Sequence, residues 1–236
     1  MFEYSNSQIC QDLFVISVLA GKRHGSYVEI GACSPVQGSN TWLLESRFGW
    51  SGLSFERAQE RVDEFNALRK NICVRADATT MDFTNIARAS GLGSHFDYLQ
   101  LGVAPPQNTL QALKNIDLDR FRFAVVTYEH DLRAGGRAER IESRAILESF
   151  GYARVLSDAK NEDRAVADWW VRPDQMPNES WRSFIGEAIS MDMKNMPASM
   201  RENILSLTMN LLDPAHDEQA TRLSTRLRNI LRRPPP

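Results

Sequence analysis

Two acidic residues end short apolar runs, and a turn of small residues follows the first of them. Glu29 precedes Gly31 and Ala32, and Glu56 ends a second run 27 positions after Glu29. The carboxyl ends of neighbouring parallel strands meet at one edge of a doubly wound sheet, where such sheets bind nucleoside ligands. A glycine in the turn also lets the backbone approach a ligand closely. The spacing therefore predicts a site for a nucleoside cofactor.

Apolar runs alternate with helical patterns along most of the chain, which is typical of a parallel sheet covered by helices on both faces. We expect strands at 27–30, 53–55, 72–74, 96–101 and 123–128. We expect helices at 7–19, 41–48, 58–68, 83–89, 108–116 and 138–150. Two later runs, 154–156 and 169–171, have no helical pattern between them and suit an antiparallel pair. The sequence predicts a three-layer α/β fold with a doubly wound, mostly parallel sheet and an antiparallel final strand.

The pattern changes after residue 174. We expect residues 1–174 to form the α/β domain with its N-terminal helix, and residues 175–236 to form a helical extension with disordered last residues. Prolines divide this extension into pieces with helical spacing at 181–189, 200–212 and 218–231. The last piece combines one apolar stripe with several arginines. Docking on the core requires one such stripe. The basic face could instead contact a membrane surface, an acidic partner or a second copy of the chain.

The composition argues against several classes of protein. The 236 residues are 42% hydrophobic and 25% charged with a formal net charge of -2, so the charge does not indicate a nucleic-acid partner. No apolar stretch reaches the roughly 20 residues of a membrane span, and the N-terminus lacks the basic region of a signal peptide. Three widely spaced cysteines without a CxxC pair argue against a disulfide framework or a zinc site. We expect a cytoplasmic protein.

Several short motifs follow one another in a fixed order. They are Ser7-Gln8 with Gln11-Asp12, Val28 to Thr41, Phe48 to Leu53 leading to Glu56, Asp97-Tyr98-Leu99, Tyr128-Glu129-His130, Val155 to Asp158, and Asp168 to Val171. In this order the set resembles the FkbM-type methyltransferases over roughly 70% of the chain. The resemblance implies a Rossmann-like class I fold, S-adenosylmethionine as cofactor, and methylation of hydroxyls on sugars or sugar-bearing natural products.

The chain departs from the family pattern after the fourth expected strand. Where the family has Asp-Val-Glu-Gly, this chain reads Gly102-Val103-Ala104-Pro105. Both carboxylates are absent, which puts in doubt any contact that those acids make with a metal or a substrate. The change also raises the alternative of a relative that keeps the fold but serves as a non-catalytic binding or assembly module.

The candidates for cofactor binding follow the first three expected strands. They are Glu29, Gly31, Ala32, Asn40, Glu56 and Asp77. The first three would line the methionine end, and Glu56 would accept both ribose hydroxyl hydrogens with its two oxygens. Structural alternatives are a plain tight turn for Gly31, a helix start for Glu56, and a turn role for Asp77 in place of an adenine contact. Asn40 would either hold the loop or reach the ligand.

His130 is the candidate general base. Methyl transfer to a hydroxyl requires positioning and removal of a proton, and only this one of the four histidines stands at the carboxyl end of an expected core strand. Glu129 would orient it or contact the ligand, and the alternative is a histidine with local hydrogen bonds only. Asp131 beside it is weak evidence for a metal site. Since Gly102 supplies no carboxylate, we expect no metal.

The sequence thus predicts an O-methyltransferase that acts on a sugar-containing or small-molecule acceptor. A nicotinamide-dependent oxidoreductase is a weaker alternative, because no Gly-x-Gly-x-x-Gly follows the first strand. We expect Asp158 and Asp168 to stabilise turns. Trp169 and Trp170 would pack in the sheet, with a sugar platform as the alternative.

Overall fold

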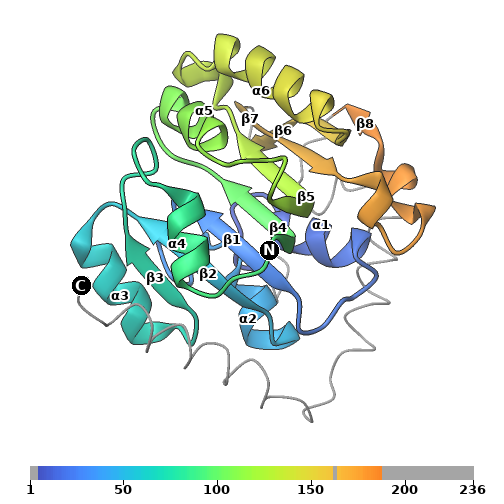
Figure 1. The fold of residues 1–236 in the computed structure, drawn as a ribbon. Helices are drawn as coiled ribbons and strands as arrows, with labels where there is room; N and C mark the ends of the chain where they lie inside the picture. Colours follow the sequence, from blue (N-terminus) through green and yellow to red (C-terminus); the bar gives the residue numbers. More distant parts are fainter. Residues whose placement is uncertain (1–4, 162–163, 188–236) are drawn as a thin grey trace.

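The computed structural model describes residues 5–161 and 164–187, which form one sheet with helices on both faces (Figure 1). The strands are β1 (Ser26–Ile30), β2 (Ser51–Glu56), β3 (Ile72–Arg75), β4 (His95–Leu101), β5 (Arg122–Glu129), β6 (Ala153–Asn161), β7 (Arg164–Val171) and β8 (Gly186–Glu187). The α-helices are α1 (Gln11–Val18), α2 (Trp42–Phe48), α3 (Gln59–Leu68), α4 (Phe83–Ala89), α5 (Pro106–Lys114) and α6 (Arg137–Ser149). The 3-10 helices are η1 (Leu132–Ala134), η2 (Pro173–Gln175) and η3 (Glu179–Phe184).

The order of the strands places a switch point in the middle of the sheet. Over the described ranges the order is β3-β2-β1-β4-β5-β7-β6-β8. Strands β1 to β5 are parallel, and β7 runs antiparallel to both β5 and β6. The chain changes direction across the sheet between β1 and β4, where doubly wound sheets bind ligands beyond the carboxyl ends of the strands. The predicted fold is confirmed.

The alternation of side chains along the strands separates two cores. Tyr27 and Tyr98 face α1 and α2, whereas Val28, Ile30 and Leu99 face α4, α5 and α6. Figure 1 shows α5 and α6 on one side of the sheet and α1 and α2 on the other. Because successive residues of a strand point to opposite faces, every second residue after Tyr27 and Tyr98 lies on the α1–α2 side. This face carries the polar residues of the site.

Two elements differ in length from the prediction. The first helix begins at Gln11 rather than at residue 7, because the Ser5 and Ser7 hydroxyls each donate to Asp12 Oδ1 at 2.7 Å and hold the preceding segment outside the helix. The closing pair is longer than 154–156 and 169–171, and β6 contains register shifts against β7.

The described start of the C-terminal extension packs on the main core. The prediction of a helix over 181–189 is wrong in part: η3 ends at Phe184, and residues 186–187 pair with β6. Trp181 and Phe184 are buried in the same cluster as Phe14, so this segment is anchored by apolar contact. The later predicted helices, including the basic one, lie outside the described residues. None of the helices within the described ranges is long and apolar enough to cross a membrane.

The residue that follows α3 fixes the loop after β1. Arg69 is 3% exposed, and its guanidinium binds Glu45 Oε2 at 2.8 Å. It also donates to the Pro35 carbonyl at 2.8 Å and to Thr41 Oγ1 at 3.0 Å. Burial disfavours its charged form, but the neighbouring Tyr27 and the acids around it outweigh this effect and raise the pKa of Arg69. One buried cation therefore ties α2, α3 and the loop together.

Replacement of Arg69 by Met should lower the free energy of unfolding by about 3–5 kcal/mol, because Glu45 is then a buried charge without its partner. Urea unfolding at neutral pH measures the loss. Arg122→Ala, at an exposed position on β5, is the control and should change stability by less than about 0.5 kcal/mol. A loss below about 1 kcal/mol in Arg69→Met would show that the loop is held by other contacts.

Candidate functional site

A cavity of about 310 Å³ lies at the carboxyl edge of the parallel strands. This volume is at the lower end of the range of small-molecule sites. Its wall includes every residue that the sequence indicated for cofactor binding: Glu29, Gly31, Ala32, Asn40, Glu56 and Asp77. Residues from the loops after β1, β2, β3 and β4 thus meet at the switch point of the sheet.

Gly31 stands where the backbones leaving β1 and β4 come together. Its φ is +88°, and a Cβ at this position would lie 2.0 Å from the Gly102 carbonyl oxygen. The Gly102 amide donates to the Ile30 carbonyl at 3.0 Å, so the two chains are held at this distance. The tight-turn role therefore holds for Gly31, and the same turn forms the wall of the cavity.

Glu29 lies within β1 rather than at its end. It is 1% exposed, and its Oε2 accepts hydrogen bonds from Ser54 Oγ at 2.7 Å and Thr41 Oγ1 at 3.0 Å. Burial raises the pKa of Glu29, against the lowering effects of the Arg69 charge and of the two hydroxyls. Through its hydrogen bond with Thr41, Glu29 helps to hold the loop after β1 in place, and it also lines the cavity.

Glu56, the last residue of β2, connects the loop after β1 to the start of α3. Its Oε2 accepts from the Cys33 amide at 3.2 Å, and its Oε1 accepts from the Arg57 and Ala58 amides at 2.8 and 2.9 Å. Glu56 therefore also stabilises the start of α3, which was the structural alternative for this residue. Since each carboxylate oxygen has two acceptor positions, acceptor capacity remains for a ligand in the cavity.

Asn40 and Asp77 differ in whether their side-chain oxygens find hydrogen-bond partners within the protein. Asn40 is 5% exposed, and its Oδ1 is buried with no hydrogen-bond partner among the described residues. Asp77 Oδ1 accepts from the Thr79 amide and hydroxyl at 2.9 and 2.6 Å, and these bonds lower the pKa of Asp77. Asp77 thus has the turn role that the sequence allowed, whereas Asn40 presents an unsatisfied acceptor at the cavity wall.

Three amide side chains of the wall were not among the cofactor candidates from the sequence. Gln8 reaches the cavity because Ser7 pairs with Gly38 in an isolated bridge. Gln100 lies on β4 next to Glu29 of β1, and its buried Oε1 has no partner among the described residues. Asn108 comes from α5. The alternation of Tyr98, Leu99 and Gln100 was a signal for the second of these, since it places Gln100 on the Tyr98 face.

Glu129 ends β5 and lines the cavity. Its side chain is partly buried. Burial raises the pKa of Glu129 to about 7, although a hydrogen bond from Gln100 acts in the opposite direction. The cavity therefore contains a carboxyl group that changes its charge near neutral pH, which is the property expected of a general base.

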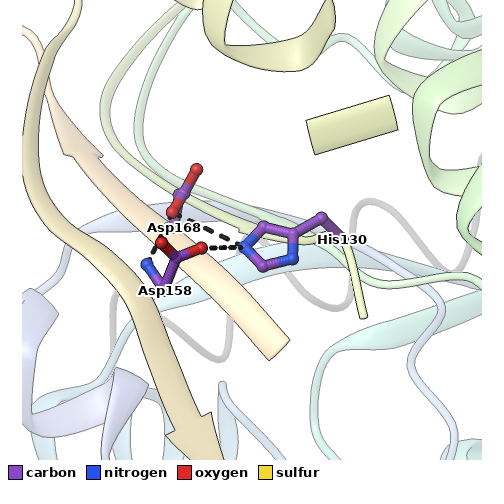
Figure 2. A group of neighbouring side chains, drawn as sticks. All are labelled: His130, Asp158 and Asp168. Atoms are coloured by element: carbon purple, nitrogen blue, oxygen red, sulfur yellow. Dashed lines mark hydrogen bonds and ion pairs between the residues drawn. The ribbon is translucent and has the colours of Figure 1, made fainter. Parts of the chain in front are cut away.

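His130, the predicted base, lies outside the cavity wall. Its ring is fully buried, and Nε2 lies 3.4 Å from Asp158 Oδ1 and 3.5 Å from Asp168 Oδ1 (Figure 2). Figure 2 shows the ring directed at both carboxylates, which come from β6 and β7. The structure brings Glu129 to the cavity wall and does not bring His130 there. The alternative of local hydrogen bonds is not met either, because both ring nitrogens of His130 lack a hydrogen-bond partner among the described residues and the ring contacts the carboxylates only at ion-pair distance.

The two acids beside His130 are bound to arginines of α6. Arg144 donates to both oxygens of Asp168 at 2.6 and 2.8 Å, and Arg140 donates to both oxygens of Asp158 at 2.7 and 2.5 Å. Burial opposes ionisation of Asp168, but Arg144 and His130 outweigh it and hold the pKa of that carboxyl well below its usual range. The expectation that both acids stabilise turns is wrong, because Asp158 lies within β6 and Asp168 within β7, and both anchor α6 to the sheet.

The same cluster has the donor types of a metal site. Among the described residues, ligand atoms of His130, Asp158 and Asp168 lie within 4.8 Å of one another. A cation there would have to displace Arg144, which bridges both acids. Two guanidinium groups already neutralise the two carboxylates, so the geometry favours ion pairs over metal ligation.

Trp169 and Trp170 are both 0% exposed. They belong to the cores on opposite faces of the sheet. The packing role is confirmed, and neither ring is available as a platform for a sugar.

Comparison with known proteins identifies the fold. No family model matches the chain, and no curated protein matches it. A protein of Clostridium thermocellum assigned as an rRNA methylase has 13% sequence identity and a TM-score of 0.51 over 71% of this chain and 97% of its own. An O-methyltransferase from Bacillus cereus has 14% identity and a TM-score of 0.48 over 72% and 83%. Human methyltransferase-like protein 13 has 13% identity and a TM-score of 0.47 over 92% and 96%. The similarity to the first of these shows a Rossmann-like, class I methyltransferase fold.

The raised pKa of Glu129 predicts a pH-dependent stability. Between the ordinary value of 4.5 and about 7, the folded protein binds a proton that the unfolded chain has released. Stability should therefore fall as the pH rises through this window, by at most about 3 kcal/mol from this group. Glu129→Gln cannot ionise, so its stability relative to the wild type should increase from pH 5 to pH 8.

Urea unfolding at both pH values measures this difference, with Glu64→Gln at an exposed position of α3 as the control for the pH series. An equal effect of Glu129→Gln at pH 5 and pH 8 would contradict the raised pKa.

Proposed function

We propose that this chain is an S-adenosylmethionine-dependent O-methyltransferase of the FkbM type that acts on a hydroxyl of a glycan or a glycosylated small molecule. One observation carries the proposal: six residues predicted for one cofactor, from loops far apart in the sequence, converge on one cavity. This cavity lies at the switch point of a sheet with the class I methyltransferase fold. The ordered motifs of the sequence support the family.

The residues of the cavity fit the groups of this cofactor. The buried oxygens of Asn40 and Gln100 have no partner among the described residues. Leaving a buried polar atom unsatisfied costs roughly 1–3 kcal/mol, and the donors of a ligand would remove that cost. Glu56 would accept from a ribose hydroxyl at the position that remains on Oε2, and Asp77 would accept from the adenine amino group. The cofactor, when bound, supplies an activated methyl group on a sulfonium.

The turn after β1 would hold the amino-acid end of the cofactor. Gly31 and Ala32 form this part of the wall, and Glu29 lies beneath them. The loop is fixed by Arg69 and by Thr41, so its conformation does not depend on the ligand. A loop that is already ordered loses little entropy on binding, which supports specific recognition of a small cofactor.

The rest of the cavity wall suits a methyl acceptor that carries no negative charge. Val103, Ala104 and Asn108 contribute apolar and neutral polar surface beside Glu129. The arginines of the wall, Arg57 and Arg61, come from the segment around the start of α3. A hydroxyl-bearing acceptor fits the neutral surface, and the assignment to glycans rests on the family resemblance.

A non-catalytic binding module is the second candidate. Gly102 and Ala104 stand where the family carries its acids, and this observation favours the module. It predicts tight cofactor binding without transfer to any acceptor. Turnover with a set of glycosylated hydroxyl acceptors would exclude it.

The proposal includes a cytoplasmic location. No disulfide joins Cys10, Cys33 or Cys73 in the described part of the chain, which suits a reducing compartment. The extension expected from residue 175 begins with a segment that packs on the core and pairs with β6, so only its later helices stay a prediction. The basic segment 218–231 would contact a partner or a second copy of the chain.

Calorimetric titration with S-adenosylhomocysteine tests the cofactor assignment. We expect binding in the micromolar range, on the order of -8 kcal/mol, and no binding of a nicotinamide dinucleotide. Glu56→Ala should weaken binding by about 1.5–3 kcal/mol, because hydrogen bonds to a charged group are lost. Glu60→Ala, at an exposed position of the same helix region, is the matched control. Absence of binding by the wild type would refute the cofactor assignment, and unchanged affinity in Glu56→Ala would remove Glu56 from the ribose site.

A further inference from the structure

The missing side chain at the end of β4 leaves a space that another residue fills. A Cβ on Gly102 would lie 2.6 Å from both Cδ and Oε2 of Glu129, and 2.8 Å from Gln100 Nε2. Contacts below 3.0 Å do not occur for real Cβ atoms without a shift. The carboxyl group of Glu129 therefore occupies the place that a side chain on residue 102 would take.

The register of the two strands explains this position. Gln100 pairs with Thr127, and Leu101 pairs with Tyr128, so the next residues, Gly102 and Glu129, lie side by side where the strands end. A carboxyl group on β5 thus reaches across to the end of β4. Residue 102 has no acid of its own, and the Glu129 carboxyl group lies at this part of the cavity wall.

The surroundings of Glu129 suit a group that takes up a proton. From β4, the Gln100 amide donates a hydrogen bond to it, and Asp131 in the following turn adds a negative charge. Tyr98 of β4 also interacts with its charge, and Glu29 of β1 lies on the same face of the sheet. Burial raises the pKa of Glu129 to about 7, so the carboxylate is a stronger base than an exposed one.

We propose that Glu129 is the catalytic base of this site and that its carboxyl group acts from the place where a side chain on residue 102 would lie. The inference rests on the proposed methyl transfer. The Glu129 carboxylate takes the proton of the acceptor hydroxyl and becomes a carboxylic acid. The acceptor oxygen forms its bond to the methyl carbon as the bond between that carbon and sulfur breaks, and the electron pair of the broken bond remains on sulfur.

His130 is the rival for this role. Its ring lies with Asp158, Asp168 and the arginines of α6, and it is absent from the cavity wall. Glu129 and His130 are consecutive, and their side chains leave the end of β5 in different directions. Only the first of them reaches the space beside Gly102.

A thermal-unfolding cycle tests the geometry without cofactor. Gly102→Ala should lower the melting temperature, because the added methyl group meets the Glu129 carboxyl group. In the Glu129→Ala background, Gly102→Ala should lower the melting temperature by a smaller amount, because the space beside residue 102 is then open. Equal penalties in both backgrounds would contradict the shared space.

Relocation of the carboxylate tests the chemistry. Glu129→Ala should retain affinity for S-adenosylhomocysteine and lose roughly 10²–10⁴-fold in transfer rate. The double variant Gly102→Asp/Glu129→Ala should recover part of this loss, because a carboxylate returns to the same place, whereas Gly102→Asn/Glu129→Ala should not. The wild-type rate should rise with pH through about 7, and this dependence should disappear in Glu129→Gln.

The outcomes separate the two proposals. Full transfer activity in Glu129→Ala, or loss of activity confined to a well-folded His130→Gln, would overturn the assignment of the base while the cofactor assignment stands. A wild type that does not bind S-adenosylhomocysteine would refute the proposed function, and with it the role of Glu129 as base. The unfolding cycle still reports whether Glu129 occupies the space at residue 102.

Discussion

Arg69 carries its positive charge with 3% of its surface exposed, and the conformation of the loop after β1 follows from how that charge is satisfied. Its guanidinium binds Glu45 and donates to Pro35 and Thr41. Thr41 in turn donates to Glu29. A buried charge is tolerated only when it is paired and hydrogen-bonded, so each of these groups needs the others. The loop that forms one wall of the cavity is therefore held by the protein core.

This constraint divides the polar residues of the site into two sets. Glu29 is satisfied by Ser54 and Thr41 and supports the loop. Asn40 and Gln100 line the cavity, and each has a buried oxygen that lacks a partner among the described residues. The two sets arise from one face of the sheet, where Glu29 and Gln100 are neighbours in register. The loop is held in place by the core, and polar atoms of the cavity wall lack hydrogen-bond partners. A pre-formed small-molecule site combines these two properties, because little conformational entropy is then lost on binding.

The sequence predicted the fold and a set of residues that line one cavity because both depend on local patterns. Alternating strands and helices, and acids at strand ends, are visible without tertiary information. The partner of Gly102 was not visible, since Glu129 reaches it across the gap between two strands. The same limit applies to Asp168, whose partner Arg144 lies 24 residues earlier on α6. The sequence places Glu129 and His130 together at a strand end, but consecutive residues of a strand point to opposite faces, so only Glu129 lines the cavity.

A crystal structure of the complex with S-adenosylhomocysteine tests the central claim most directly, because the claim concerns where each part of the cofactor lies. We expect the ribose hydroxyls on Glu56, the amino-acid end at the Gly31 turn, and the sulfur on the side of the cavity that Glu129 lines. A nucleoside bound away from Glu56, or a sulfur turned away from Glu129, would contradict this account of the site.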